Sequence, residues 1–308
     1  MRVLVTGVSG YVGAALVPRL QAAGHEVRGF ARSPERVATA GVRLDDVVLG
    51  DAVSGTGLAR ALDGADAAYY LIHSMEGPAG VGFAEQERRS AERFATAARA
   101  AGVRRVVYLG GLVPDTGTVS RHLASRLAVE EALLEAADEA IALRASIVIG
   151  ARSRSFRFLV RLIERLPVLA LPAWRSNRTQ PIDGRDVLDF LVAAADAPAA
   201  LAGRSHDIAG PDAMTYQELI ERIAEAMLVE RPAIPLGFSL TPVASVVAAA
   251  VAAEDPGFIT PLMESLESDL LPRDDDAAQA FGIRLHSFDA AVERALRDWE
   301  QTEEVAAK

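Results

Sequence analysis

The chain has 308 residues, half of them hydrophobic, so a large core is possible and global disorder is excluded. Its net charge of −10 argues against nucleic-acid binding driven by phosphate neutralisation. The absence of cysteine excludes disulfides, thiolate metal sites and a cysteine nucleophile. Because Met1 and Arg2 lead directly into a strand, no signal peptide is expected and the predicted location is cytoplasmic.

The first predicted elements are a strand, a tight turn and a helix. The apolar run Val3 to Val5 precedes three glycines spaced three apart, and a helical apolar pattern continues to Ala23. In this context Gly7 permits the turn, Gly10 lets the backbone approach a pyrophosphate, and Gly13 lets the helix pack on the strand. The stretch therefore predicts a dinucleotide site rather than a simple turn. The other cofactor contacts expected here are Thr6, Ser9, Tyr11 and Val12.

The second strand, His25 to Arg32, ends where an NAD site would carry a carboxylate for the ribose 2′-hydroxyl. Ala31 and Arg32 stand there instead, followed by Ser33. A guanidinium can pair a 2′-phosphate bidentately, so NADP(H) is favoured over NAD(H), with Arg32 and Ser33 as contacts. The alternative is an exposed arginine at the start of a loop.

The third strand, Val47 to Asp51, ends in the pair Gly50 and Asp51, which is expected near the adenine ring. Asp51 could equally cap the helix predicted from Gly57 to Leu62. The fourth strand runs from Asp66 to Met75, and its carboxyl end should face the ligand crevice. The contacts expected from it are Leu71, Ile72, His73 and Ser74, although His73 has a structural alternative as a hydrogen-bonded wall residue.

A fifth strand, Arg105 to Gly111, and a sixth, Ile141 to Ile149, alternate with helices over Phe83 to Ala101 and Ser120 to Ala137. The six strand–helix repeats over about the first 150 residues predict a doubly wound parallel sheet with helices on both faces. Gly110 and Ser146 complete the predicted cofactor contacts.

The regular alternation ends near Gly150. We therefore predict an NAD(P)-binding Rossmann domain over residues 1–150 and a smaller, mostly helical substrate-binding region over 151–308, with some strands returning to the Rossmann body. The uncharged stretch 236–253 is interpreted as a buried or partner-facing helix rather than a membrane contact. Asp274, Asp275 and Asp276 are read as a charge cluster at a helix start, and no metal site is expected.

The candidate substrate residues are mostly apolar or aromatic, which favours a small hydrophobic substrate. They are Tyr70, Met75, Leu112, Phe156, Trp174 and Gln180.

These motifs together carry a resemblance. The pattern Thr6-Gly7-x-x-Gly10-x-x-Gly13, the pair Gly50-Asp51 and the stretch Arg178 to Ile182 resemble the short-chain dehydrogenase/reductase superfamily, in particular its atypical, extended-type branch near the NmrA-like group. The resemblance covers nearly the whole chain. It implies a Rossmann domain whose nicotinamide end is covered by a small C-terminal domain. It also implies that the two long helices could form a homodimer contact.

The sequence departs from the superfamily at its catalytic pair. Where the superfamily usually has Tyr-x-x-x-Lys, this chain has His122 and Arg126, four residues apart on one helical face. His122 could act as acid and base, and Arg126 could bind the nicotinamide ribose; the alternative is a helix-surface pair. An NADPH-dependent reductase is the leading hypothesis, and a regulatory cofactor-binding protein or a lyase or epimerase remains open.

Overall fold

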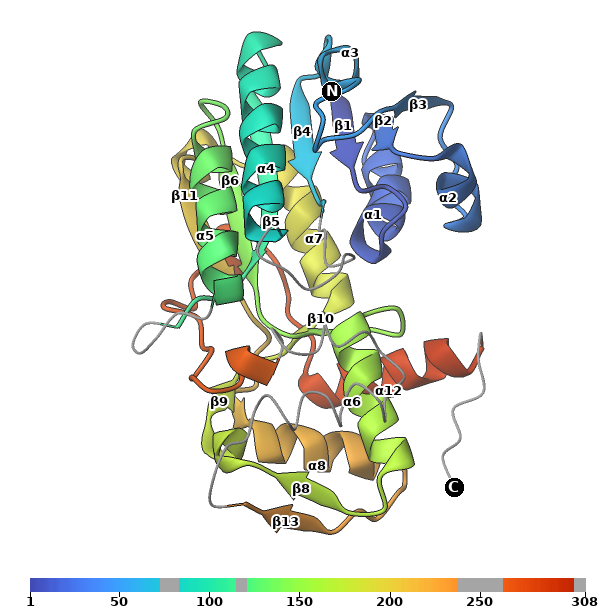
Figure 1. The fold of residues 1–308 in the computed structure, drawn as a ribbon, viewed down its shortest axis with the longest axis vertical. Coiled ribbons are helices and arrows are strands. Elements are labelled where there is room, and N and C mark those ends of the chain that lie inside the picture. The colour runs from blue at the N-terminus through green and yellow to red at the C-terminus, as the bar shows by residue number, and fades with distance from the viewer. Residues whose placement is uncertain (73–82, 115–120, 237–262, 302–308) are drawn as a thin grey trace.

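The computed structural model describes residues 1–72, 83–114, 121–236 and 263–301, and its central element is a seven-stranded parallel sheet (Figure 1). The strand order is β11-β6-β5-β4-β1-β2-β3, so the order reverses between β1 and β4. The predicted doubly wound sheet is confirmed. The strands are β1 (Arg2–Thr6), β2 (Glu26–Ala31), β3 (Asp46–Leu49), β4 (Ala67–Tyr70), β5 (Arg105–Gly111), β6 (Ile141–Ala145) and β11 (Arg204–Ile208).

Alternate side chains of each central strand point to opposite faces of the sheet, and each face packs against its own layer of helices. Val3 and Val5 pack into one hydrophobic cluster, and Leu4 between them packs into another. On the Val3 side lie α1 (Tyr11–Ala22), α2 (Pro34–Thr39) and α7 (Gly184–Ala195). On the Leu4 side lie α3 (Leu58–Leu62), α4 (Phe83–Ala100) and α5 (Arg121–Leu134).

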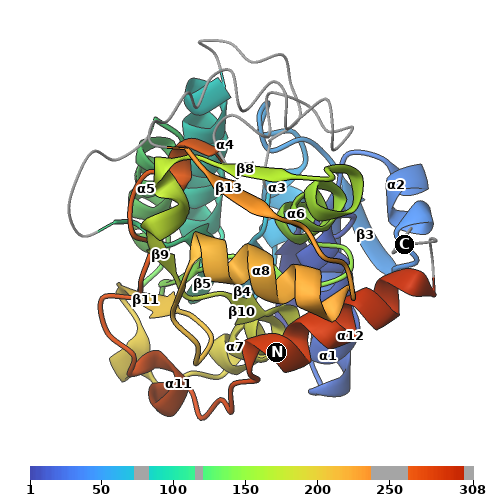
Figure 2. The ribbon, with the colours of Figure 1, turned by 90° about the horizontal axis from the view of Figure 1, so that it is seen from below.

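A second layer of the molecule lies below the carboxyl ends of these strands and has its own core (Figures 1 and 2). Figure 2 shows α8 and α12 side by side beneath the sheet. Trp299, on α12, is fully buried there, and the guanidinium carbon of Arg157 lies 4.4 Å from its ring centroid. The helices are α6 (Arg154–Arg165), α8 (Tyr216–Ala226), α11 (Ala277–Ala280) and α12 (Phe288–Glu300), with 3-10 turns η1 (Ala173–Ser176) and η2 (Ala199–Leu201).

Three short strand pairs lie outside the seven-stranded sheet. The pairs are β7 (Val148–Ile149) with β10 (Ile182–Asp183), β9 (Arg178–Thr179) with β12 (Met214–Thr215), and β8 (Leu169–Leu171) with β13 (Ala233–Pro235). The single strand predicted over Ile141 to Ile149 was wrong, because the chain leaves the main sheet after Ala145 and β7 pairs with β10 instead. Helix α8 begins with a capping box, in which Thr215 and Glu218 hydrogen bond reciprocally.

The edge of the main sheet is formed by a strand from beyond residue 150. β11 pairs in parallel with β6 over its five residues. A buried ion pair lies at this junction: Nε of Arg144 donates to Glu130 at 2.9 Å, and Asp207 of β11 lies 3.7 Å from the same guanidinium. The sheet is therefore completed only by the second half of the chain.

Within the described ranges, no helix is both long and apolar enough to cross a bilayer. The stretch 236–253, which was interpreted as a buried or partner-facing helix, lies outside those ranges after Leu236.

Candidate functional site

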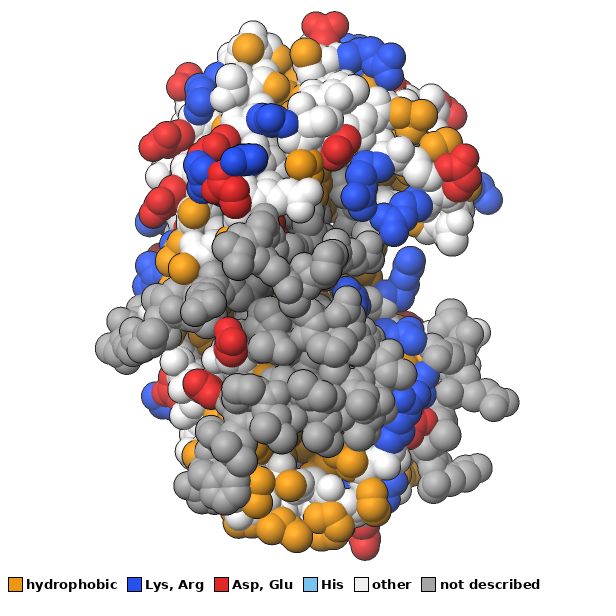
Figure 3. Space-filling model, in the orientation of Figure 1, with side chains coloured by type: hydrophobic (Ala, Val, Ile, Leu, Met, Phe, Trp, Pro, Cys, Tyr) orange, Lys and Arg blue, Asp and Glu red, His pale blue; other side chains and the backbone are white. Residues whose placement is uncertain are grey.

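A cleft of about 750 Å³ opens at the carboxyl ends of β1, β2 and β4, between the main sheet and the start of α6. It is the position where open parallel sheets bind ligands, since the strand order reverses there. On the face shown in Figure 3, basic side chains lie on both sides of the indentation at the right. Among the residues that the structure describes, the lining includes the glycine turn, four arginines and a single carboxylate, which suits an elongated anionic ligand.

The glycine turn leaves no room for a side chain at Gly7 or Gly13. Gly7 has φ +68°, and a Cβ atom on Gly13 would lie 2.3 Å from the carbonyl oxygen of Gly7. The amide of Gly10 donates to the same oxygen at 2.9 Å, and α1 begins at the next residue. The first amides of α1 therefore face the cleft with the positive end of the helix dipole, as a pyrophosphate requires.

Thr6 holds two strands in register at the base of this turn. Its buried hydroxyl donates to the carbonyl of Tyr69 at 2.9 Å and accepts from the amide of Leu71 at 3.1 Å. Leu71 lines the cleft and Thr6 does not. The structure thus gives Thr6 a role in positioning the end of β4.

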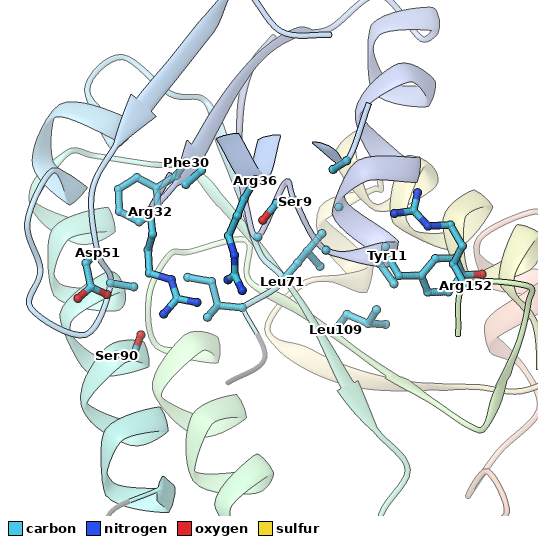
Figure 4. A pocket seen from close by; sticks show the side chains of 18 of the residues that line it. Ser9, Tyr11, Phe30, Arg32, Arg36, Asp51, Leu71, Ser90, Leu109 and Arg152 are labelled. Carbon is cyan, nitrogen blue, oxygen red and sulfur yellow. The ribbon is translucent and has the colours of Figure 1, made fainter. Parts of the chain in front are cut away.

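Arg32 and Arg36 line one end of the cleft, and in Figure 4 their guanidinium groups point into the same part of it. Ser33 caps α2 by accepting from the amide of Arg36 at 3.3 Å, so Arg36 stands in the first turn of this helix. Arg32 makes no hydrogen bond or ion pair with any residue that the structure describes. A pair of guanidinium groups beside a strand end can bind a phosphate.

Asp51 also lines this end, next to the aromatic ring of Phe30. Its Oδ1 accepts from the amide of Val53 at 3.0 Å, and the N-cap of α3 is Gly57 without a side-chain bond. The alternative that Asp51 caps this helix was therefore wrong: its carboxylate closes a local turn at the cleft wall.

Tyr11 and Arg152 lie side by side at another part of the cleft (Figure 4). A Cβ atom on Gly150 would lie 2.2 Å from the Tyr11 hydroxyl oxygen, and one on Gly184 would lie 2.4 Å from it. Burial, and then the charge of Asp183, raises the pKa of Tyr11 to about 12. The ring of Tyr11 thus fits between two glycine backbones of the second half of the chain.

The sheet side of the cleft is lined by Leu71, Ile72 and Leu109. Arg126 does not line it: this buried guanidinium donates to the carbonyl of Leu109 at 2.9 Å and lies over the ring of Tyr108. Arg126 therefore positions a wall residue. The backbone of His122 belongs to α5, whereas its side chain lies outside the described part, as do His73, Ser74 and Met75.

No tyrosine of this chain has the lowered pKa of a catalytic phenol. Burial raises the pKa of each of the five, which are Tyr11, Tyr69, Tyr70, Tyr108 and Tyr216. Lys308 is the only lysine in the sequence, so none of the residues that the structure describes is a lysine that could lower a phenol's pKa. This count is visible in the sequence and strengthens the departure noted there.

Several predicted site residues lie in the protein interior. Tyr70 is buried and its hydroxyl donates to Ser90 at 3.0 Å, so it supports the cleft wall from behind. Phe156 and Trp174 are buried in the core of the second layer, because helix-spaced apolar residues there face α8 and α12. The remaining predicted residues that do not line the cleft are Ser33, Gly50, Gly110, Leu112, Ser146 and Gln180.

Three of the arginines that line the cleft, Arg36, Arg152 and Arg154, were missed in the sequence. Arg36 follows Arg32 at helical spacing, which is a usable signal. Arg152 and Arg154 gave none, because their place depends on the contact between Tyr11 and Gly150.

The fold and the cleft define a dinucleotide-binding Rossmann protein, and comparisons with known proteins agree. Residues 7–147 match the NAD(P)H-binding family. The chain is 28% identical over 224 residues to the mitochondrial NADH dehydrogenase [ubiquinone] 1 alpha subcomplex subunit 9 of Arabidopsis thaliana, a match over 70% of this chain and 56% of that protein. The chain thus spans about half the length of that relative.

Two further matches cover a larger share of the other protein. The chain is 27% identical to the ceramide reductase of Caulobacter vibrioides over 73% of this chain and 70% of that protein. The structure of dTDP-glucose 4,6-dehydratase from Streptomyces venezuelae with NAD bound superposes with a TM-score of 0.70, at 19% identity over 98% of both chains. This last likeness concerns the fold. Together the matches show an NAD(P)H-binding segment over residues 7–147, and they agree with the resemblance to the short-chain dehydrogenase/reductase superfamily.

Proposed function

We propose that this protein binds NADP(H) and uses it to reduce a small hydrophobic carbonyl or enone compound. The observation that carries the cofactor preference is the pair Arg32 and Arg36 at the end of β2, where Ala31 leaves room for a 2′-phosphate. A carboxylate at that strand end would instead favour the 2′-hydroxyl of NAD(H).

The residues of the cleft fit the cofactor along its length. The glycine turn and the start of α1 receive the pyrophosphate, Asp51 and Phe30 stand at the adenine end, and Leu71 leads toward the nicotinamide end. Bound NADPH would supply a hydride. The relative named ceramide reductase supports a lipid-like carbonyl compound as the acceptor.

The proton for such a reduction has to come from a group other than a tyrosine paired with lysine, because every tyrosine has a raised pKa. His122, on the helix position that the superfamily gives to tyrosine, is the candidate donor, since imidazole titrates near neutral pH. His122→Phe is expected to lower kcat by about 100-fold or more with unchanged NADPH affinity. A variant with normal kcat would exclude His122 as the donor.

The same observation favours a second candidate function: binding of NADP(H) without turnover. The chain lacks the phenol–lysine pair, and one relative is named as a subunit of the mitochondrial NADH dehydrogenase [ubiquinone]. Purified protein should first be titrated with NADPH and NADH, and NADPH oxidation should then be followed with aldehydes, quinones and enones. Turnover of any member supports the reductase; tight NADPH binding without turnover supports the second function; no nucleotide binding refutes both.

A further inference from the structure

We propose that Arg152 binds the pyrophosphate of the dinucleotide in the cleft that the glycine turn lines. The inference rests on the proposed cofactor function and adds a contact from outside the NAD(P)H-binding family match, which ends at residue 147. It makes Arg152 a cofactor-binding residue of the second layer of the molecule.

The segment that carries Arg152 is held in place by close packing against Tyr11. This segment follows β7, and its Gly150 backbone touches the hydroxyl of Tyr11, the residue directly after Gly10. A side chain at Gly150 or Gly184 would collide with that hydroxyl, so the three residues form one close-packed contact. Arg152 is therefore held two residues away from a contact with the pyrophosphate turn itself.

The guanidinium of Arg152 is open to a ligand. Arg152 is exposed, lines the same cleft as Ser9 and Gly10, and has no hydrogen-bond or ion-pair partner among the residues that the structure describes. Arg185, by contrast, is paired with Asp183. Arg152 thus keeps all its donors available to an anion.

Charge balance also favours this contact. A helix N-terminus supplies about half a positive charge, whereas a pyrophosphate carries about two negative charges, so α1 alone leaves most of that charge unbalanced. Arg32 and Arg36 lie at another part of the cleft, beside Asp51 (Figure 4). Arg152 provides a full positive charge beside Tyr11, in the same cleft as Ser9 and Gly10 of the turn.

The experiment compares Arg152→Ala with Arg32→Ala for three ligands: NADPH, NADH and 2′-AMP, which has the 2′-phosphate without a pyrophosphate. Arg152→Ala should weaken NADPH and NADH by the same factor, about tenfold, and leave 2′-AMP unchanged. Arg32→Ala should weaken NADPH and 2′-AMP and spare NADH. Arg297→Ala, an exposed arginine of α12 that does not line the cleft, is the matched control, and thermal unfolding checks the fold of each variant.

The inference is overturned if Arg152→Ala binds NADPH and NADH as the unmodified protein does, or if it loses 2′-AMP binding as strongly as NADPH binding. Failure of the unmodified protein to bind either dinucleotide would instead overturn the proposed function. The two failures are therefore distinguished by one set of titrations.

Discussion

Replacing Arg32 by alanine tests the cofactor preference directly. The side chain is exposed and makes no ion pair with the described residues, so its removal leaves no buried charge behind, and stability should not change. What is lost is one guanidinium–phosphate contact in a half-open cleft. We expect about 1–2 kcal/mol, at the lower end for a charge-assisted hydrogen bond because solvent screens it, which is about a 5- to 30-fold weaker affinity for NADPH.

The assay is an equilibrium titration of NADPH and NADH at one fixed ionic strength, since screening changes both affinities. NADH affinity should stay within about twofold, because NADH has no 2′-phosphate for Arg32 to contact. Arg43→Ala removes another exposed arginine, one that does not line the cleft, and serves as the control. Equal weakening of NADPH and NADH, or no weakening of either, would refute the assignment of the 2′-phosphate to this end of the cleft.

Two further predictions concern stability. Gly13→Ala forces a Cβ atom to 2.3 Å from a backbone oxygen, so it should destabilise the fold by about 3 kcal/mol and abolish NADPH binding. Gly111→Ala, where a Cβ atom would lie 3.9 Å from the nearest atom and φ is not positive, is the matched control. Thr215→Ala removes the N-cap of α8 and should cost about 1 kcal/mol at neutral pH, measured by denaturant unfolding. Hydrogen bonds from the Thr215 amide and then its hydroxyl lower the pKa of Glu218, so the capping box stabilises the fold above the ordinary carboxyl pKa and this contribution is lost as pH falls. The difference between Thr215→Ala and the unmodified protein should therefore narrow in acid, and a constant difference would contradict the pairing.

The sheet and the glycine turn could be predicted because their signals are local. Hydrophobic periodicity changes within a few residues of Gly7, and parallel sheets bind ligands at one defined edge. The lining of the cleft beyond this turn was less accessible. Phe156 and Trp174 are of the residue types that line pockets, yet both are buried in the core of the second layer. An apolar side chain does not by itself show whether it lines a cleft or packs in a core. Arg152 depends on a contact between Tyr11 and Gly150, residues far apart in the sequence, which no local pattern records.

The placement of β11 at the edge of the main sheet has a consequence for synthesis of the chain. β6 pairs with β5 on one side, but its neighbour on the other side, β11, begins only at Arg204. A nascent chain therefore carries an open edge on β6 while the intervening segment is translated. During that interval Arg144 already has Glu130 but lacks Asp207. A fragment that stops near residue 150 would keep this open edge permanently, and it would be prone to pair with other copies of itself rather than to behave as a free-standing nucleotide-binding unit.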